Sequence, residues 1–199
     1  MWNDRYASEE YLFGTEPAAF LRAQAHHLPP ASHVLAVADG EGRNSVWLAE
    51  QGHRVTAFDS AANAVAKAEA LAAARGVEVA LHRASLADWA WDACAYDAVA
   101  AIFIQFVGPA ERRALFADIA RTIRPGGVLL LHGYAPRQVE YGTGGPPHAE
   151  NMYTLEMLRA AFRGWEILRE ADYDADIDEG TGHSGRSALI DFVAVKPGG

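Results

Sequence analysis

The chain has 199 residues, of which half are hydrophobic and 22% are charged, a composition typical of one globular domain with a substantial core. Seventeen basic residues against 26 acidic ones give a formal net charge of −9, and no basic cluster exceeds the pair Arg112-Arg113. A nucleic acid would be repelled at long range by this charge, so we expect a small-molecule partner and no nucleic acid.

Neither a membrane segment nor an exported, disulfide-bonded protein is predicted. The longest apolar run, Ala98 to Ile104, is far shorter than the roughly 20 residues that a membrane-spanning helix needs. The single cysteine, Cys94, excludes an internal disulfide, and residues 1–6 lack the basic and apolar regions of a secretory signal. We therefore expect a cytoplasmic protein.

The segment Val34–Ser45 has the pattern of a buried strand, a glycine turn and the start of a helix. Gly40 and Gly42 allow backbone conformations closed to residues with a Cβ, so the main chain can approach a ligand at the carboxyl end of the strand. A second strand, His53–Phe58, leads into Asp59, an acidic residue about 20 positions after the turn, placed to accept hydrogen bonds from ribose hydroxyls. The pattern favours a ligand that contains adenosine over a purely structural turn.

The rest of the chain alternates between helical and extended patterns. We predict helices at 45–51, 60–75 and 110–124 and one that begins at Thr154, and strands at 78–83, 96–103, 128–132, 165–169 and 187–195. Five strand-helix alternations imply right-handed crossovers and a parallel sheet. The last two strands are joined by a polar loop alone, which predicts an antiparallel hairpin. The expected fold is a single-domain α/β, Rossmann-like doubly wound sheet of about seven strands, mostly parallel.

Three segments carry a resemblance to a known family: Gly40-Glu41-Gly42-Arg43-Asn44-Ser45, Leu48–Gly52 and Val55–Asp59. Together they resemble the cofactor half of class I S-adenosylmethionine-dependent methyltransferases. The chain is most similar to the small bacterial branch that includes tellurite-resistance-type and thiopurine-type enzymes. The resemblance implies an S-adenosylmethionine-dependent enzyme of one domain, residues 1–199, in which residues 1–30 form a helical cap over the cofactor and residues 31–199 form the core.

The resemblance also implies which residues bind the cofactor. The first strand end meets the methionine part, Asp59 and Ser60 meet the ribose, and Ser85 and Leu86 meet the adenine. Phe103, with Phe106 nearby, flanks the sulfonium, and an arginine of the N-terminal segment meets the carboxylate. The predicted cofactor-binding residues are Arg5, Gly14, Ala38, Asp39, Gly40, Asn44, Asp59, Ser60, Ser85, Leu86 and Phe103.

Three positions depart from the family pattern. Ala36 stands where an acidic residue is usual, Ala38 where a glycine is usual, and Ser85 where an aspartate is common. These departures leave room for an alternative function, a non-catalytic S-adenosylmethionine-binding module that acts as a sensor or partner subunit. A second alternative, a nicotinamide-dependent oxidoreductase, is disfavoured because the terminal hairpin replaces a second nucleotide-binding half.

Two glycine-rich loops, at 140–147 and 179–186, are predicted to lie near the methyl acceptor and to form a lid. They offer Tyr141, His183 and Arg186 as candidate catalytic residues. A sulfur, selenium or tellurium acceptor needs no general base, whereas an oxygen or nitrogen acceptor would need one, and His132 and Tyr134 join the candidates in that case. The sequence specifies neither the acceptor nor an oligomeric state.

No metal site is predicted. None of the eight histidines has the spacing of a metal pair. The alternating aspartates from Asp172 to Asp178 suggest a calcium loop, but Ile177 occupies the position where such a loop requires glycine. The aspartates are therefore interpreted as a solvated edge.

Overall fold

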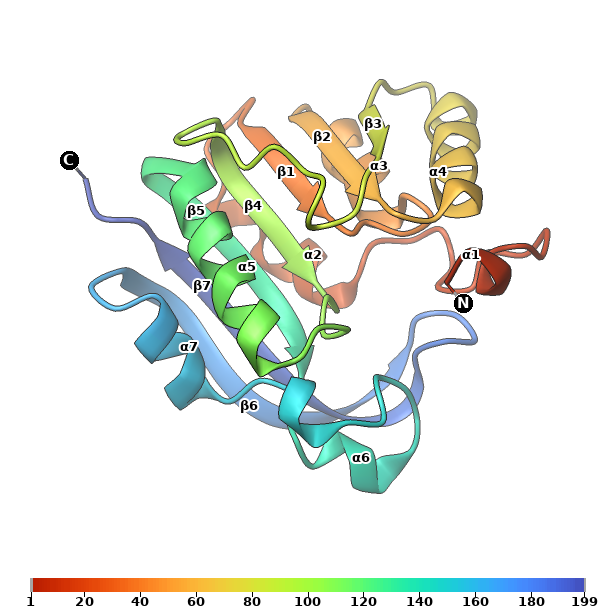
Figure 1. Ribbon diagram of the computed structural model, residues 1–199. Coiled ribbons are helices and arrows are strands. Elements are labelled where there is room, and N and C mark those ends of the chain that lie inside the picture. The colour runs from red at the N-terminus through yellow and green to blue at the C-terminus, as the bar shows by residue number, and fades with distance from the viewer. Residues whose placement is uncertain (1, 199) are drawn as a thin grey trace.

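The computed structural model describes residues 2–198, so Met1 and Gly199 lie outside the description. Seven strands form one sheet in the order β3-β2-β1-β4-β5-β7-β6, with helices on both faces (Figure 1). β1 to β5 pair in parallel, and β7 is antiparallel to both of its neighbours. The strands are β1 (His33–Val37), β2 (Arg54–Asp59), β3 (Ala80–Arg83), β4 (Tyr96–Ile102), β5 (Ile123–Tyr134), β6 (Glu166–Asp178) and β7 (Ser184–Val195).

The helices are short except for those that connect the parallel strands. The α-helices are α1 (Trp2–Arg5), α2 (Ala19–Gln24), α3 (Arg43–Glu50), α4 (Ala62–Arg75), α5 (Pro109–Thr122), α6 (Gln138–Tyr141) and α7 (Leu155–Ala161), and two 3₁₀ turns are η1 (Ala25–His27) and η2 (Ala149–Asn151). Within residues 2–198, none of these helices combines the length and the apolar character that crossing a membrane requires.

The central strands are apolar on both faces because both faces are covered. Leu35 and Val99 belong to the core cluster that α5 and α7 complete, whereas Val34 and Ala98 belong to the cluster that α2 and α3 complete. Successive strand residues point to opposite faces, so a continuous apolar run serves two cores at once. The sheet thereby fixes the carboxyl ends of β1, β2 and β4 side by side, where a ligand site is expected.

The predicted fold class is confirmed. The sheet has seven strands, the first five are parallel, and the last two form an antiparallel hairpin. The alanine-rich helix ends where predicted, at Arg75, and Gly76 at its C-cap has a φ of 67°, the left-handed conformation that favours glycine.

The fifth strand differs from the prediction. Pro125-Gly126-Gly127 does not separate the helix from the strand, because α5 ends at Thr122 and β5 begins at Ile123. A Cβ on Gly127 would lie 2.6 Å from the carbonyl oxygen of Asp97, so the glycine allows the strand to approach β4. The Gly126 amide donates to the Lys196 carbonyl oxygen at 3.0 Å. The two glycines therefore lie within an irregular part of strand β5. A Pro-Gly-Gly sequence is equally typical of a loop, so composition alone does not distinguish the two structures.

The terminal hairpin is longer than predicted, because β6 continues to Asp178 and β7 starts at Ser184. Along this extension exposed aspartates alternate with Tyr173, Ala175 and Ile177, which pack against the cluster containing Tyr134. This alternation has the period of a half-buried strand, which the prediction of a polar loop between the last two strands missed. The hairpin turn, residues 179–183, consequently reaches the ligand end of the sheet.

Candidate functional site

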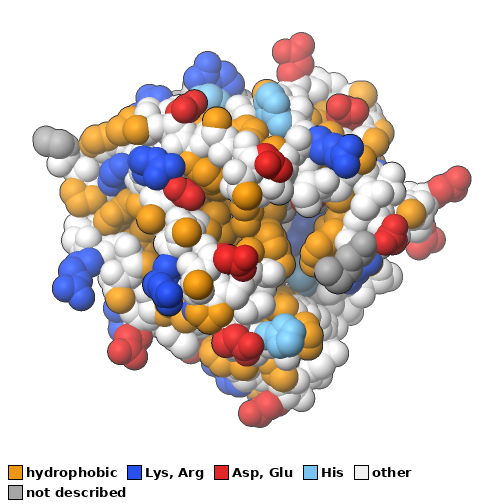
Figure 2. Space-filling model, viewed as in Figure 1, with side chains coloured by type: hydrophobic (Ala, Val, Ile, Leu, Met, Phe, Trp, Pro, Cys, Tyr) orange, Lys and Arg blue, Asp and Glu red, His pale blue; other side chains and the backbone are white. Residues whose placement is uncertain are grey.

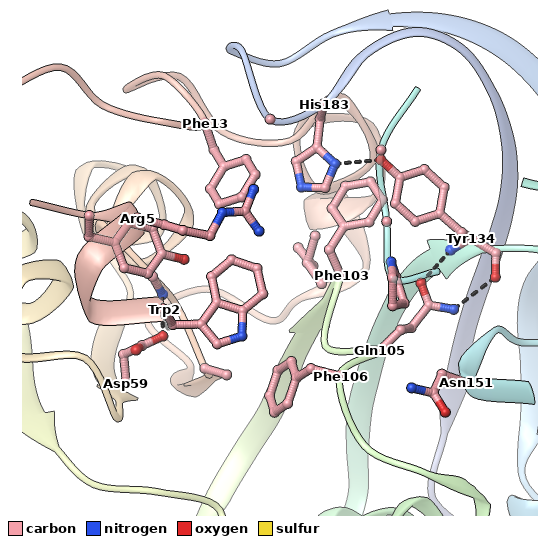
Figure 3. Close-up of a pocket in the computed structure, with 18 of the residues that line it drawn as sticks. Trp2, Arg5, Phe13, Asp59, Phe103, Gln105, Phe106, Tyr134, Asn151 and His183 are labelled. Carbon is pink, nitrogen blue, oxygen red and sulfur yellow. Dashed lines mark hydrogen bonds between the residues drawn. The ribbon is translucent and has the colours of Figure 1, made fainter. Parts of the chain in front are cut away.

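A pocket of about 570 Å³, called here the main pocket, opens at the carboxyl ends of β1, β2 and β4. This face is hollowed between hydrophobic side chains (Figure 2). Figure 3 shows Trp2, Arg5 and Asp59 on one side of the pocket and Phe103, His183 and Tyr134 on the other. The lining comprises Trp2, Arg5, Tyr6, Phe13, Ala38, Gly40, Arg43, Asn44, Asp59, Ser60, Ile102, Phe103, Gln105, Phe106, Tyr134, Gly144, Gly145, Pro146, Pro147, His148, Asn151, Gly182 and His183.

The glycine turn after β1 has the conformation that the sequence predicts. Gly40 and Gly42 have φ values of 63° and 90°. Gly42 is irreplaceable on steric grounds as well, because a Cβ there would lie 2.7 Å from the Cβ of Ala68. Ala38, at the end of β1, also has a positive φ, 48°, which explains why a glycine suits this position.

Asp59 links two loops at the edge of the main pocket. One carboxylate oxygen accepts a hydrogen bond from the Gly40 amide at 3.0 Å, and the other accepts one from the Ala61 amide at 2.8 Å. Burial raises the pKa of this carboxyl, and the backbone donors oppose the rise. The side chain also lines the main pocket, so it holds the glycine turn and faces the cavity at the same time.

Asp39 turns away from the main pocket. Its carboxylate accepts hydrogen bonds from the amide and the hydroxyl of Ser45, in the first turn of α3. Burial raises the pKa of Asp39 to about 7, the Ser45 hydroxyl opposes the rise, and the nearby Asp59 carboxylate adds to it. Asp39 therefore acts on the cofactor end through α3 rather than by lining the pocket.

A second pocket of about 260 Å³ adjoins the main one and shares Ala38, Ser60 and Phe106 with it. Ser85 and Leu86 line this second pocket. The predicted cofactor residues thus differ in which of the two pockets they line. Arg5, Ala38, Gly40, Asn44, Asp59, Ser60 and Phe103 line the main pocket, Ser85 and Leu86 line the second, and Gly14 and Asp39 line neither.

His183 lies at the other end of the main pocket. Its ring stacks on Phe103 at 4.3 Å between centroids and lies 4.4 Å from the ring of Phe13. Its Nδ1 is hydrogen-bonded to the Tyr134 hydroxyl (Figure 3). Burial, followed by the positive charge of Arg43, lowers the pKa of His183 to about 3, so the ring is neutral at pH 7. Burial also raises the pKa of Tyr134 well above its ordinary value.

Phe103 is held in a strained position between the two ends of the pocket. Its φ is 55°, a conformation that costs a bulky residue about 1–3 kcal/mol and occurs preferentially at functional sites. Its amide donates to the His132 carbonyl oxygen at 2.8 Å, and its ring packs edge-on against the His132 ring. His132 in turn bonds to Asp191 at 2.9 Å. His132 supports Phe103 from behind and does not line the main pocket.

The N-terminal segment is held to the glycine turn by side chains whose anchoring role the sequence analysis did not predict. Glu41 accepts a hydrogen bond from the Leu12 amide at 2.8 Å and pairs with Lys67 at 2.7 Å. Asn44, which was predicted to bind cofactor, accepts one from the Ala18 amide at 3.0 Å. The sequence signal for this anchoring is a polar residue at or next to the start of the helix that follows a glycine turn, because its side chain lies beside the pocket and can bind the backbone of a covering segment.

Two of the three candidate catalytic residues lie outside the main pocket. The Tyr141 hydroxyl donates to Asp174 at 2.7 Å, and Arg186 pairs with the same carboxylate at 3.0 Å. Arg137 also bonds Asp174, and these contacts lower the pKa of that carboxyl. The cluster fastens α6 to the exposed side of the hairpin. Of the three candidates, the structure brings only His183 into the pocket.

Among the residues that the structure describes, no group of three or more His, Cys, Asp or Glu side chains is arranged to hold a metal ion. The alternating aspartates of β6 instead meet arginines, as in the pairs of Arg137 with Asp172 and Asp174.

Comparisons with known proteins agree with this geometry. Residues 34–127, from β1 into β5, match the family model described as a methyltransferase domain. No curated protein matches the sequence.

Solved structures share the fold over nearly the whole chain. The first comes from work on the conversion of a disulfide bond into a thioacetal group during echinomycin biosynthesis, with a TM-score of 0.74, 19% identity and coverage of 96% of this chain and 86% of that chain. TehB from Haemophilus influenzae has a TM-score of 0.72 and 17% identity over 98% of this chain and 65% of its own. An S-adenosylmethionine-dependent methyltransferase from Methanosarcina mazei has a TM-score of 0.70 and 17% identity over 92% of this chain and 100% of its own.

The strand order and the pocket at the carboxyl ends of the parallel strands define an α/β protein of the methyltransferase fold. The segment that matches the methyltransferase-domain model carries Gly40, Gly42 and Asp59. The methyltransferase-domain match and the shared fold together support an S-adenosylmethionine-dependent methyltransferase, with S-adenosylmethionine as the implied cofactor. The likeness to TehB, at 17% identity, is a likeness of fold.

Proposed function

We propose that this enzyme methylates a compact small molecule whose acceptor atom is sulfur or another soft chalcogen, already nucleophilic at neutral pH. The observation that carries the proposal is the character of the acceptor end of the main pocket. It is lined by Phe103, Phe106, Tyr134, Asn151 and His183, together with the loop 144–148. This end contains no carboxylate and no lysine among the described lining residues.

No deep group at the acceptor end is suited to remove a proton at neutral pH. A general base is most effective when its pKa lies near the working pH. Burial and neighbouring positive charge lower the pKa of His183 to about 3, and burial raises that of Tyr134. His148 lies at the rim, with 63% of its side chain exposed, beside Glu150. An alcohol or an amine would lack a buried base here, whereas a thiolate needs none.

Aromatic walls also suit this chemistry. Phe103 and Phe106 offer ring faces that attract a sulfonium, each worth about 1 kcal/mol, and sulfur makes favourable contacts of similar size with aromatic rings. Phe106 borders both pockets, so its ring lies between the two halves of the site. The cofactor supplies an activated methyl group when bound, which leaves the protein to position the acceptor and exclude water.

The cofactor contacts form part of the same proposal. The main pocket, with Arg5, Gly40 and Asp59, accommodates the methionine and ribose parts, and the second pocket, with Ser85 and Leu86, accommodates the adenine. The N-terminal 30 residues act as the cap, since Trp2, Arg5, Tyr6 and Phe13 all line the main pocket. The first structural relative adds support for a sulfur acceptor, because its description concerns a thioacetal group.

The test is a transfer assay with methyl-labelled S-adenosylmethionine and four acceptor pools: small thiols, selenite and tellurite, phenols, and amines. We expect label in the thiol or chalcogen products and a rate that does not require a group titrating near pH 7. His148→Gln is the matched control, since it removes the rim imidazole. Transfer confined to phenols or amines, or abolished by His148→Gln, would contradict the proposed acceptor class.

A further inference from the structure

Arg43 forms a buried ion pair that connects the glycine turn to the terminal hairpin. It is the first residue of α3, directly after Gly42. Its guanidinium donates to Glu179 at 2.9 Å, and the two side chains are only 7% and 10% exposed. The other terminal nitrogen lies 3.4 Å from the Phe13 carbonyl oxygen, to which it also donates. A single side chain therefore contacts the cofactor turn, the N-terminal segment and the hairpin.

Glu179 begins the hairpin turn that carries His183. Its amide donates to the His183 carbonyl oxygen at 2.8 Å, which closes the turn. Its second carboxylate oxygen accepts a hydrogen bond from the Ala19 amide at 3.0 Å, at the start of α2. The position of Glu179 is thus fixed from two sides, and the turn is attached to it.

The turn fits against the N-terminal segment without spare room. A Cβ on Gly180 would lie 2.6 Å from the Leu12 carbonyl oxygen, and one on Gly182 would lie 2.3 Å from the Phe13 ring. The Gly182 amide donates to the Leu12 carbonyl oxygen at 3.1 Å. A turn packed this closely has one position, and that position sets the stacking of His183 on Phe13.

We propose that Arg43 and Glu179 are a positioning pair that holds the turn 179–183, and with it the His183 ring, over the acceptor end of the main pocket. The geometry of the acceptor site is then set by a residue of the cofactor turn. The role of the pair in transfer rests on the proposed function above, whereas its effect on His183 does not.

The neighbours of His183 make its titration a direct readout of this geometry. Arg43 and Arg5 face the ring with positive charge, His132 lies nearby behind Phe103, Tyr134 bonds its Nδ1, and Phe13 and Phe103 cover its faces. A ring held there stays neutral through the pH range in which an exposed histidine titrates. A ring released by a loosened turn titrates between about pH 5 and 8.

The experiment compares the parent with Glu179→Gln by NMR of the histidine Cε1–Hε1 groups, with His183 assigned by its loss in His183→Ala. We expect the His183 resonance of Glu179→Gln to move and to titrate between about pH 5 and 8. Arg159→Gln, which breaks the exposed pair with Glu170, is the matched control and leaves His183 as in the parent. An unchanged, non-titrating His183 in Glu179→Gln overturns the proposal.

Two further measurements separate the positioning role from other roles. S-adenosylhomocysteine binding by calorimetry is expected to change less than about threefold in Glu179→Gln, because Glu179 does not line the main pocket. A loss of ligand affinity as large as the effect on transfer would place the pair in the cofactor site and overturn the proposal. With benzenethiol as acceptor, kcat is expected to fall about tenfold with little change in the KM for cofactor.

Arg43→Lys provides a second variant in case Glu179→Gln does not fold. The ammonium keeps a charge opposite Glu179 but cannot also donate to the Phe13 carbonyl oxygen as the planar guanidinium does. His183 is expected to titrate at a pH between those of the parent and Glu179→Gln. If the parent methylates no acceptor, the proposed function fails, and the NMR result still decides the role of the pair.

Discussion

The two ends of the main pocket are built in opposite ways. The cofactor end comes from short stretches of sequence around Gly40 and Asp59, and the carboxyl groups of Asp59 in its wall and of Asp39 beside it have raised pKa values. The acceptor end is assembled from four distant segments, and it is aromatic and neutral, with a histidine whose pKa is lowered. The cofactor end can therefore be recognised from a sequence motif. The acceptor end cannot, because its residues come together only in the folded chain.

The largest expected effect comes from adding one methyl group to the cofactor end. Gly42→Ala places a Cβ 2.7 Å from that of Ala68 at a φ of 90°, so we expect a loss of about 3 kcal/mol in unfolding free energy. Gly14→Ala is the matched control, because its φ is 69° but no atom lies within 4 Å of the added Cβ. Equal losses in the two variants by urea unfolding would contradict the steric argument.

A slightly smaller effect is expected from Asp59→Ala. The loss of charge-assisted hydrogen bonds should weaken S-adenosylhomocysteine binding by about 2–3 kcal/mol in calorimetry. The hydrogen bonds to the Gly40 and Ala61 amides imply a loss of fold stability as well. Asp59→Asn keeps the shape of the side chain but only one of the two acceptor oxygens, so urea unfolding of both variants shows how much of the loss belongs to the fold. Undiminished affinity in Asp59→Ala would show that the carboxylate serves the turn alone.

The acceptor end predicts a kinetic effect instead. His183→Ala should lower transfer to the acceptor about tenfold, or ~1.4 kcal/mol, with cofactor affinity retained. The sequence predicted the same for Tyr141→Phe and Arg186→Ala, but both residues bond Asp174 outside the pocket. We now expect those two variants to match the parent within about twofold. A Tyr141→Phe enzyme as impaired as His183→Ala would extend the acceptor site to α6.

The two ends should also respond to acid in opposite directions. A histidine with a folded pKa of about 3 stabilises the fold above its unfolded pKa near 6.5, and this stability is lost as the pH falls. Asp39, with a folded pKa of about 7, gives stability that is lost as the pH rises from about 4 towards 7.

Replacing either Asp39 or His183 should leave the pH dependence of stability that the other residue causes. Between about pH 4 and 6.5, we expect Asp39→Asn to lose stability on acidification relative to the parent, and His183→Gln to gain it, with slopes of up to about 1.4 kcal/mol per pH unit. Thermal or urea unfolding across this range gives the slopes. Parallel stability curves for the parent and both variants would contradict the assigned pKa shifts.

The smallest effect concerns backbone strain at the cofactor end. Ala38 has a φ of 48°, so Ala38→Gly should stabilise the fold by about 1 kcal/mol or leave it unchanged once chain entropy is counted. Ala36→Gly, in the interior of β1, is the control and should destabilise. A clear loss of stability in Ala38→Gly would mean that the methyl group packs usefully against the pocket wall.

The sequence was most informative where chemistry is local. The glycine turn, Asp59 and the terminal hairpin follow from short-range spacing, so all three were found in advance. The positions of Phe13, Phe103 and His183 depend on how segments 80 or more residues apart meet, and no periodicity in the sequence encodes those contacts. The extension of β6 was missed for a different reason, because the polar residues between the two predicted strands were interpreted as a loop.

The alternating aspartates of β6 have a consequence beyond the pocket. β6 is the outermost strand of the sheet, and one of its sides remains available for pairing with another chain. An uninterrupted edge of this length would act as a template for intermolecular sheet growth. Carboxylates at 172, 174, 176 and 178 make such stacking electrostatically unfavourable, because copies of the strand would bring like charges together. Strand β6, which leads into the turn that contains His183, is thus also protected against intermolecular pairing by its own aspartates.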